Sequence, residues 1–208
     1  MTGPMFFSAA PWQSLLTLVL KSVALMGSPG PTNMAVMATT AAFGIRASLG
    51  FVSGAIVGTS AVLLAVATGV VALLMSIPGL GSALTLASSA YILYLAWKIA
   101  AAPPPAKQAA DGLAPSFVAG LLLAIANPKA WFAIAAVFTG SMLVETSREF
   151  DALLKTAVLT VMIVIIHLFW MLGGVSLTGF LGDPLRSRIA NILFGLILVG
   201  TTVLALIR

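Results

Sequence analysis

Long apolar runs separated by short polar or Pro/Gly-rich stretches dominate the chain. A membrane-spanning helix needs about 20 apolar residues to cross a hydrocarbon core of roughly 30 Å. By this measure the pattern predicts six spans, over residues 12–43, 47–76, 82–102, 116–139, 153–173 and 189–207. Because such runs must satisfy their backbone hydrogen bonds internally, we expect an all-α integral membrane protein.

The first predicted span is interrupted at the sequence SPGPTN. Pro29 and Pro31 lack amide hydrogens, and each disfavours helical geometry in the residue before it. We therefore expect a true break, after which a new helix begins at Pro31. The first amides of that helix, at Thr32 and Asn33, would have no intrahelical partner and would form a positive helix end inside the membrane.

The fourth predicted span carries a second interruption, at IANPKAWF. Asn127 can cap a helix that begins with Pro128 and has Lys129 in its first turn. Each half of the chain thus opens with a broken helix. Three spans per half make the halves antiparallel, which is typical of transporters built from inverted repeats. We predict two three-helix repeats, residues 1–102 and 116–208, joined by a linker at residues 103–115. The simpler alternative is that neighbouring helices merely tolerate these prolines.

Composition narrows the class of protein. Apolar residues make up 61% of the chain and charged residues 7%, which excludes a soluble globule. The net charge of +5 reflects loops rich in Lys and Arg rather than nucleic-acid binding. If there are six spans, five basic residues lie on one side of the membrane, namely Arg46, Lys98, Lys107, Arg186 and Arg188, and three lie on the other, namely Arg148, Lys155 and Arg208. Because cytoplasmic loops carry an excess of Lys and Arg, this count predicts that both termini lie outside the cytoplasm. With no cysteine and one histidine, we expect no disulfide, no metal site and no cofactor.

Gly50, Gly54 and Gly58 recur at four-residue spacing in the second span. Small residues on one helical face allow another backbone to approach closely. Two interpretations remain open, namely tight packing within one subunit and a homodimer interface through this face.

Together these motifs resemble those of the LysE/RhtB-type amino-acid exporters of bacteria. The shared elements are PGPTN, the spaced glycines of FGIRASLGFVSGAIVG, and NPKAWF. ASSAYILYLAWKI and RIANILFGLILVGTTVLAL are similar more weakly. A departure is FTGSM, where the family has Pro-Gln-Phe close to the fourth span. The resemblance implies a multi-pass protein of the bacterial cytoplasmic membrane that exports amino acids or close derivatives, driven by the proton gradient.

The two breaks supply the candidate substrate site. Its residues are Pro29, Gly30, Pro31, Thr32, Asn33, Asn127, Pro128 and Lys129. All five carboxylates lie in loops or at span ends, so a cationic side chain would find no buried anion. An amino acid's carboxylate, in contrast, would meet two positive helix ends and Lys129. We therefore expect neutral amino acids as substrates.

Proton coupling has two candidates at membrane depth, His167 and Lys21. The structural alternatives are a hydrogen-bonded packing role for His167 and a Lys21 side chain that reaches the membrane interface. The expected partners are the amino acid, protons and lipid. An intramembrane hydrolase is disfavoured because His167 sits in no nucleophile motif, so we expect no enzyme. A passive channel or scaffold bundle remains the other alternative.

Overall fold

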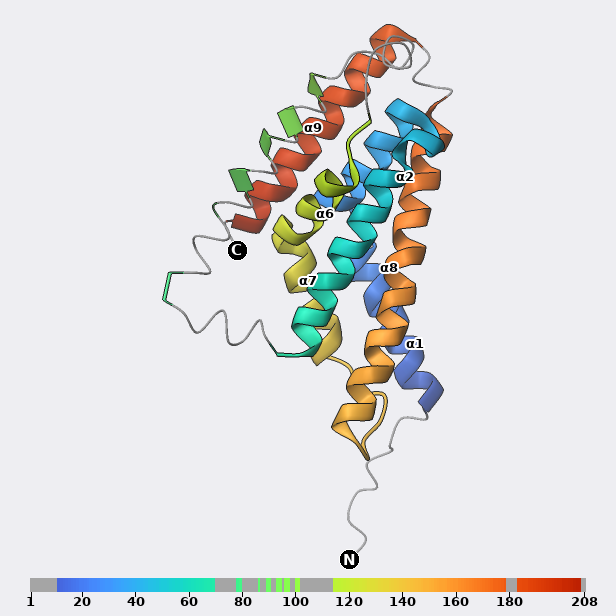
Figure 1. The fold of residues 1–208 in the computed structure, drawn as a ribbon, viewed down its shortest axis with the longest axis vertical. Coiled ribbons are helices and arrows are strands. Elements are labelled where there is room, and N and C mark those ends of the chain that lie inside the picture. Colours follow the sequence, from blue (N-terminus) through green and yellow to red (C-terminus); the bar gives the residue numbers. More distant parts are fainter. Residues whose placement is uncertain are drawn as a thin grey trace, which may run out of the picture.

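The computed structural model describes residues 11–69, 114–178 and 183–206, and between the first two ranges residues 78–79, 86, 89–90, 93–94, 96–97 and 100–101 (Figure 1). The regular secondary structure of these residues is helical. The elements in chain order are α1 (Pro11–Lys21), the π-helix η1 (Ser22–Met26), α2 (Pro31–Ala67), α6 (Phe117–Ala126), α7 (Pro128–Thr139), α8 (Arg148–Thr178) and α9 (Pro184–Leu206). The predicted linker lies outside the described residues as far as residue 113, as do Lys98, Lys107 and Arg208.

The first predicted break is confirmed. Helical structure ends with η1 at Met26, and Gly30 is fully extended with φ −172° and ψ 173°. The helix restarts with Pro31 in its first turn, where a missing amide costs nothing. Because Gly30 precedes α2, no side chain caps this helix start.

α2 contains a sharp bend at Gly44. As one straight helix its 37 residues would extend about 56 Å, far more than one crossing requires. Gly44 instead has φ 76° and ψ 171°, a conformation that favours glycine. Ser48 Oγ donates to the carbonyl oxygens of Gly44 at 2.7 Å and Thr39 at 3.1 Å, which ties the two segments together. The chain therefore rises to the bend and returns, as the light-blue and cyan parts of Figure 1 show.

The second predicted break is also confirmed. α6 and α7 meet at an angle of 62°. Asn127 lies between them with φ −80° and ψ 104°, and its Oδ1 accepts from the amide of Lys129 at 3.1 Å. The predicted N-cap and the proline start of α7 thus occur where the sequence places them.

The glycine face of α2 packs against α6 of the same chain. A Cβ added at Gly54 would lie 2.0 Å from the carbonyl oxygen of Phe117, and one at Gly58 would lie 2.6 Å from that of Leu121. Conversely, a Cβ at Gly120 would lie 2.0 Å from the carbonyl oxygen of Phe51. The two backbones therefore touch, as the first interpretation of this face requires. α6 therefore covers Gly54 and Gly58, whereas Gly50 is exposed.

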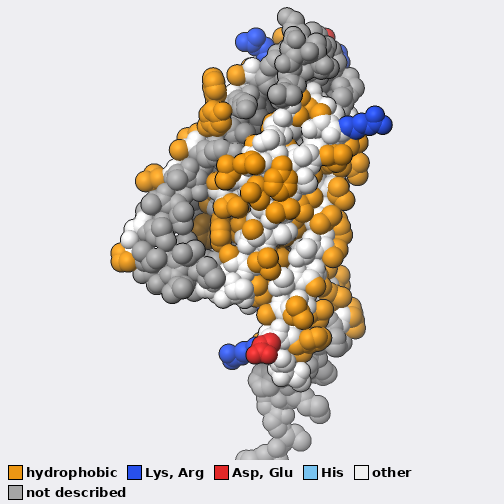
Figure 2. Space-filling view, viewed as in Figure 1, with side chains coloured by type: hydrophobic (Ala, Val, Ile, Leu, Met, Phe, Trp, Pro, Cys, Tyr) orange, Lys and Arg blue, Asp and Glu red, His pale blue; other side chains and the backbone are white. Residues whose placement is uncertain are grey.

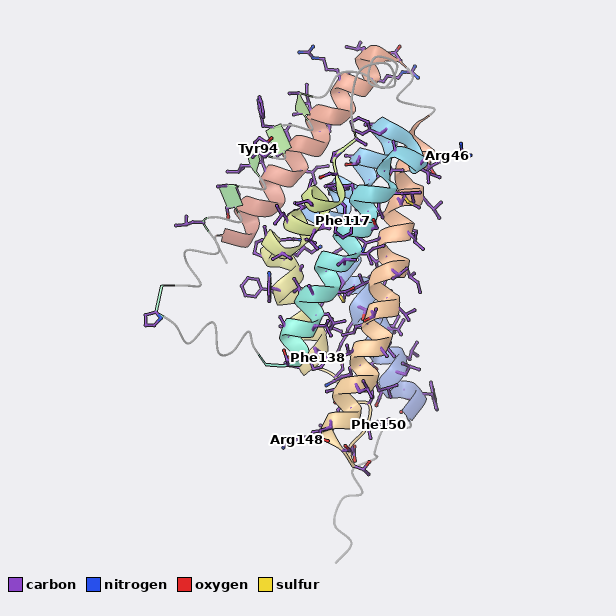
Figure 3. The ribbon with its side chains drawn as sticks, in the orientation of Figure 1. Arg46, Tyr94, Phe117, Phe138, Arg148 and Phe150 are labelled. Atoms are coloured by element: carbon purple, nitrogen blue, oxygen red, sulfur yellow. The ribbon has the colours of Figure 1, made fainter. Side chains whose placement is uncertain are left out.

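The described part of the face in Figure 2 is mainly apolar between charged ends. Figure 2 shows hydrophobic side chains over the length of the bundle, with Lys and Arg at the two ends. Figure 3 places Arg46 at one end and Arg148 at the other, as the predicted opposite sides require. By length and composition, the helices at Pro31–Ala67 and Arg148–Ser176 can cross a membrane, and α6 with α7 forms a third candidate span if the bent pair counts as one.

The described part of the third predicted span lies beside α9. Leu93, Ala96, Trp97 and Ala100 face Gly195 and its neighbours on α9 across a shallow apolar groove. The start of α9 is capped by Asp183, whose carboxylate accepts from the amides of Arg186 at 3.1 Å and Leu185 at 2.8 Å. These bonds lower the pKa of Asp183, so the cap is present at neutral pH and is lost as the pH falls through that lowered pKa.

Candidate substrate site

The two breaks lie against each other, although about a hundred residues separate them in the chain. Asn127 Nδ2 donates to Thr32 Oγ1 at 2.8 Å, and both side chains are buried. Lys129 Nζ donates to the carbonyl oxygens of Ser28 at 2.6 Å and Pro29 at 2.8 Å. The predicted site residues therefore come together from the η1–α2 connection, the start of α2, the α6–α7 connection and the start of α7.

The carbonyls from Met26 to Pro29, at the first break, each receive a side-chain donor. Asn33 Nδ2 donates to Met26 at 2.9 Å and to Ser28 at 3.0 Å. Trp170 Nε1, from α8, donates to Gly27 at 3.0 Å. With the Lys129 bonds to Ser28 and Pro29, four successive carbonyls are satisfied. Where no water can hydrate an interrupted helix, its free carbonyl groups need hydrogen-bond donors from the protein in this way.

The two helix starts differ in their capping. At the start of α7, the amide of Lys129 donates to Asn127 Oδ1, and the amide of Ala130 donates to the backbone carbonyl of Asn127 at 3.0 Å. The start of α2 has no side-chain cap. The first amides of α2 are therefore the ones placed to receive an anion, which refines the expectation of two equivalent helix ends.

A cavity of about 40 Å³ lies between the breaks and α8. Its polar lining is Thr32, Asn33, Thr59, Asn127, Lys129 and His167, and its apolar lining includes Leu25, Met26, Ala130, Ala133, Ile134, Ile163 and Ile166. Among the residues that the structure describes, no carboxylate belongs to this lining. The volume holds a few water molecules, so binding a larger solute requires the walls to move apart.

His167 lines the cavity and carries an unpaired ring nitrogen. The side chain is 3% exposed, and its Nδ1 lies 2.8 Å from the carbonyl oxygen of Ile163. Since a carbonyl only accepts, Nδ1 carries hydrogen and Nε2 of the neutral ring is an acceptor. Nε2 is buried without a hydrogen-bond partner. A buried polar atom of this kind is available to a bound solute or water.

Lys21, the other coupling candidate, lies elsewhere. Its Nζ donates to the carbonyl oxygen of Gly140, just past the end of α7. It is not among the cavity-lining residues. Nearby, Lys155 Nζ donates to the carbonyls of Phe138 and Ser141 and pairs with Asp151 at 2.7 Å. Both lysines thus bind the carbonyl-rich end of α7 rather than the cavity.

Sequence reasoning missed Thr59 and Trp170. Thr59 lies on the glycine-rich second span, and its hydroxyl also donates to the Ala55 carbonyl at 2.8 Å. Trp170 follows His167 by about one turn, which is the only local signal that it faces the same region. Neither residue belongs to a break motif, so only the packing of α2 and α8 identifies them.

The model of the LysE type translocator family matches residues 23–208, which is most of the chain. The chain belongs to this family. No curated protein and no solved structure matches it. The translocator is therefore a multi-pass membrane protein and a transporter rather than an enzyme, which removes the hydrolase alternative. The family implies export of amino acids or related solutes.

The bond that joins the breaks of the translocator can be tested by a double-mutant cycle. Thr32→Val removes the acceptor of Asn127 Nδ2, and we expect a loss of about 1–2 kcal/mol in unfolding free energy. Asn127→Ala also removes the α7 cap, so we expect a loss of about 2–3 kcal/mol. The double variant should cost less than the sum by about 1 kcal/mol, because the same bond is counted twice. Unfolding of the purified protein in mixed SDS micelles measures each term, and strict additivity would contradict the bond.

Proposed function

We propose that this translocator is a secondary active exporter of neutral amino acids or close derivatives across the bacterial cytoplasmic membrane, coupled to proton influx. The observation that carries the proposal is the meeting of both broken helices at one cavity, which is lined by both polar and apolar side chains. Broken helices whose ends converge on a solute are the binding device of transporters with inverted repeats. In this proposal six spans form two inverted three-helix repeats, and the cavity opens to each side in turn.

The choice of substrate follows from the charges at the cavity. The start of α2 offers uncapped amides, around Thr32 and Asn33, to a carboxylate. A cationic side chain would need an anionic partner, whereas the described lining has no carboxylate, and its apolar part includes small or aliphatic side chains such as Ala130, Ala133 and Ile134. This arrangement supports amino acids with uncharged side chains.

His167 is the stronger of the two coupling candidates. His167 is one of the residues that line the cavity, its Nε2 is buried without a hydrogen-bond partner, and an imidazole can accept and release a proton through its ring nitrogens. Lys21 is bonded to Gly140, at the end of α7 away from the break at Asn127. We therefore propose that His167, rather than Lys21, takes part in proton transfer at the cavity.

Efflux of labelled amino acids from proteoliposomes tests the proposal. With an imposed pH gradient, the native protein should release at least one neutral amino acid faster than without the gradient. Asn33→Ala and Lys129→Ala should each reduce this release by about tenfold or more, because each removes two hydrogen bonds that shape the break. Ser53→Ala is the matched control, since Ser53 is exposed and bonds only within its own helix turn.

Two outcomes would contradict the proposal. Release that follows the concentration gradient alone, with no effect of the pH gradient, would indicate a passive channel. Normal export by both Asn33→Ala and Lys129→Ala, at equal protein levels, would place the solute elsewhere.

A further inference from the structure

The Ser28 and Pro29 carbonyls hold an ammonium group that belongs to the protein itself. Lys129 Nζ lies 2.6 Å from the Ser28 oxygen and 2.8 Å from the Pro29 oxygen. Among the described residues, the carboxylate that forms a salt bridge with a lysine is Asp151, and its partner is Lys155 rather than Lys129. The charge of Lys129 is thus met by carbonyl dipoles at the end of a broken helix, where unwound backbone is known to bind cations.

Gly30 allows the lysine to take this position. A Cβ at residue 30 would lie 2.6 Å from Lys129 Cδ and 2.9 Å from its Nζ. The side chain therefore lies directly across the glycine. Lys129 and Gly30 both line the cavity, so the ammonium borders the space into which a solute would enter.

The surroundings of Gly30 match the two charged groups of an amino acid. The carbonyls of Ser28 and Pro29 lie on one side of it in the chain, and the uncapped start of α2 with Thr32 and Asn33 lies on the other. The α-ammonium and carboxylate of an amino acid are attached to one carbon and need such adjacent sites of opposite polarity.

We propose that the Ser28 and Pro29 carbonyls form an ammonium subsite that Lys129 occupies in the absence of substrate and that the substrate's α-ammonium takes over during transport. This inference rests on the proposed function, because it assumes that the cavity binds amino acids. It also gives Lys129 a role, because the Lys129 ammonium competes with the substrate's α-ammonium for the same two carbonyls.

The competition between Lys129 and the substrate couples the export of one amino acid to the entry of one proton. On the cytoplasmic side the α-ammonium takes the carbonyls, and the Lys129 ammonium gives one proton to water and becomes a neutral amine. On the outer side one proton from water restores the ammonium, which returns to the carbonyls and releases the substrate. One proton enters for each amino acid that leaves. His167, from α8, is the other ionisable group in the described cavity lining, and in this proposal it is the candidate to relay the proton.

Chemical labelling of lysine shows whether the Lys129 ammonium or the substrate's α-ammonium occupies the carbonyls of Ser28 and Pro29. The native protein in nanodiscs is treated with acetic anhydride at about pH 8, and acetylation at each lysine is read by mass spectrometry. The probes are L-alanine, L-valine, L-leucine and L-threonine, with methylammonium as an ammonium lacking a carboxylate and acetate as a carboxylate lacking an ammonium. A bound α-ammonium should raise acetylation of Lys129 by about threefold or more, because its amine leaves the carbonyls. Methylammonium should do the same and acetate should not.

Lys155 is the internal control, since its Asp151 pair and carbonyl bonds are remote from the cavity lining. If a probe amino acid is exported by the same preparation but leaves Lys129 labelling unchanged or lowers it, the ammonium subsite is wrong while the proposed function stands. If none of the probes is exported and none changes the labelling, both proposals fail for neutral amino acids.

Binding as a function of pH gives an independent test. In the native protein the half-saturating concentration of the exported amino acid should rise as the pH falls, approaching about tenfold per pH unit where one proton competes. Lys129→Met should flatten this dependence. Gly30→Ala should also weaken it, because the added methyl group displaces only the flexible end of Lys129. A Lys129→Met variant that keeps the native slope would overturn the coupling mechanism.

Discussion

Asp151→Asn should lower the free energy of unfolding of the translocator by about 3 kcal/mol. Asp151 and Lys155 are both at least nine-tenths buried and lie 2.7 Å apart. Asparagine keeps an oxygen for the amides of Leu143 and Val144, which Asp151 Oδ1 now receives at 2.6 and 3.0 Å. The substitution therefore removes mainly the negative charge. The ammonium of Lys155 would then be buried with only carbonyl partners. A buried charge without an opposite charge beside it strongly destabilises the folded state.

Glu149→Gln is the matched control for this experiment. Glu149 lies in the same first turn of α8 but is exposed. The same change of charge at an exposed position should cost less than about 0.5 kcal/mol. Unfolding in mixed SDS micelles measures both variants. Equal effects at the two positions would mean that the buried pair does not stabilise the α7–α8 connection.

Gly54→Ala should destabilise the bundle by about 1–3 kcal/mol and reduce transport with it. The new Cβ would lie 2.0 Å from the Phe117 oxygen and 3.0 Å from the amide nitrogen of Leu121. Both atoms belong to the backbone of α6, which cannot move aside without shifting Asn127 at its end. The thermal midpoint of the purified protein and the efflux rate should therefore fall together.

Gly50→Ala is the control on the same stripe. There the added Cβ has its nearest neighbour, the amide nitrogen of Phe117, at 3.8 Å, which is an ordinary contact. Since alanine is a better helix former than glycine by about 0.5–1 kcal/mol, this variant should be as stable as the native protein or more so. If Gly50→Ala is as harmful as Gly54→Ala, close packing against α6 is not what the stripe provides.

The breaks could be predicted because their causes are local. Proline removes an amide and constrains its neighbour whatever surrounds it, and asparagine before Pro128 is an N-cap by its own chemistry. Both helix starts accordingly occur at the expected residues. The fourth, fifth and sixth predicted apolar runs likewise coincide with the helices α6 and α7, α8, and α9, with ends that differ by up to five residues.

The partners of the polar side chains could not be predicted in the same way. Lys129 was expected beside a substrate carboxylate, but its ammonium binds the carbonyls of the other break, 101 residues earlier in the chain. Trp170 and Lys21 find their acceptors 143 and 119 residues away. Such pairings depend on how the helices pack, and hydrophobic periodicity carries no information about them. Nor does the sequence reveal that α6 of the same chain covers Gly54 and Gly58.

The donors that complete the first break also constrain how the protein is made. Asn33 follows the break closely, but Lys129 and Trp170 lie 100 and 143 residues beyond the carbonyls of Pro29 and Gly27. While the ribosome is still translating the first half, those carbonyls have no partner, and exposing each of them to lipid costs several kcal/mol. We therefore expect the amino-terminal span to reach its final place in the bilayer only after α7 and α8 have been synthesised, so that the two halves of the translocator are assembled together.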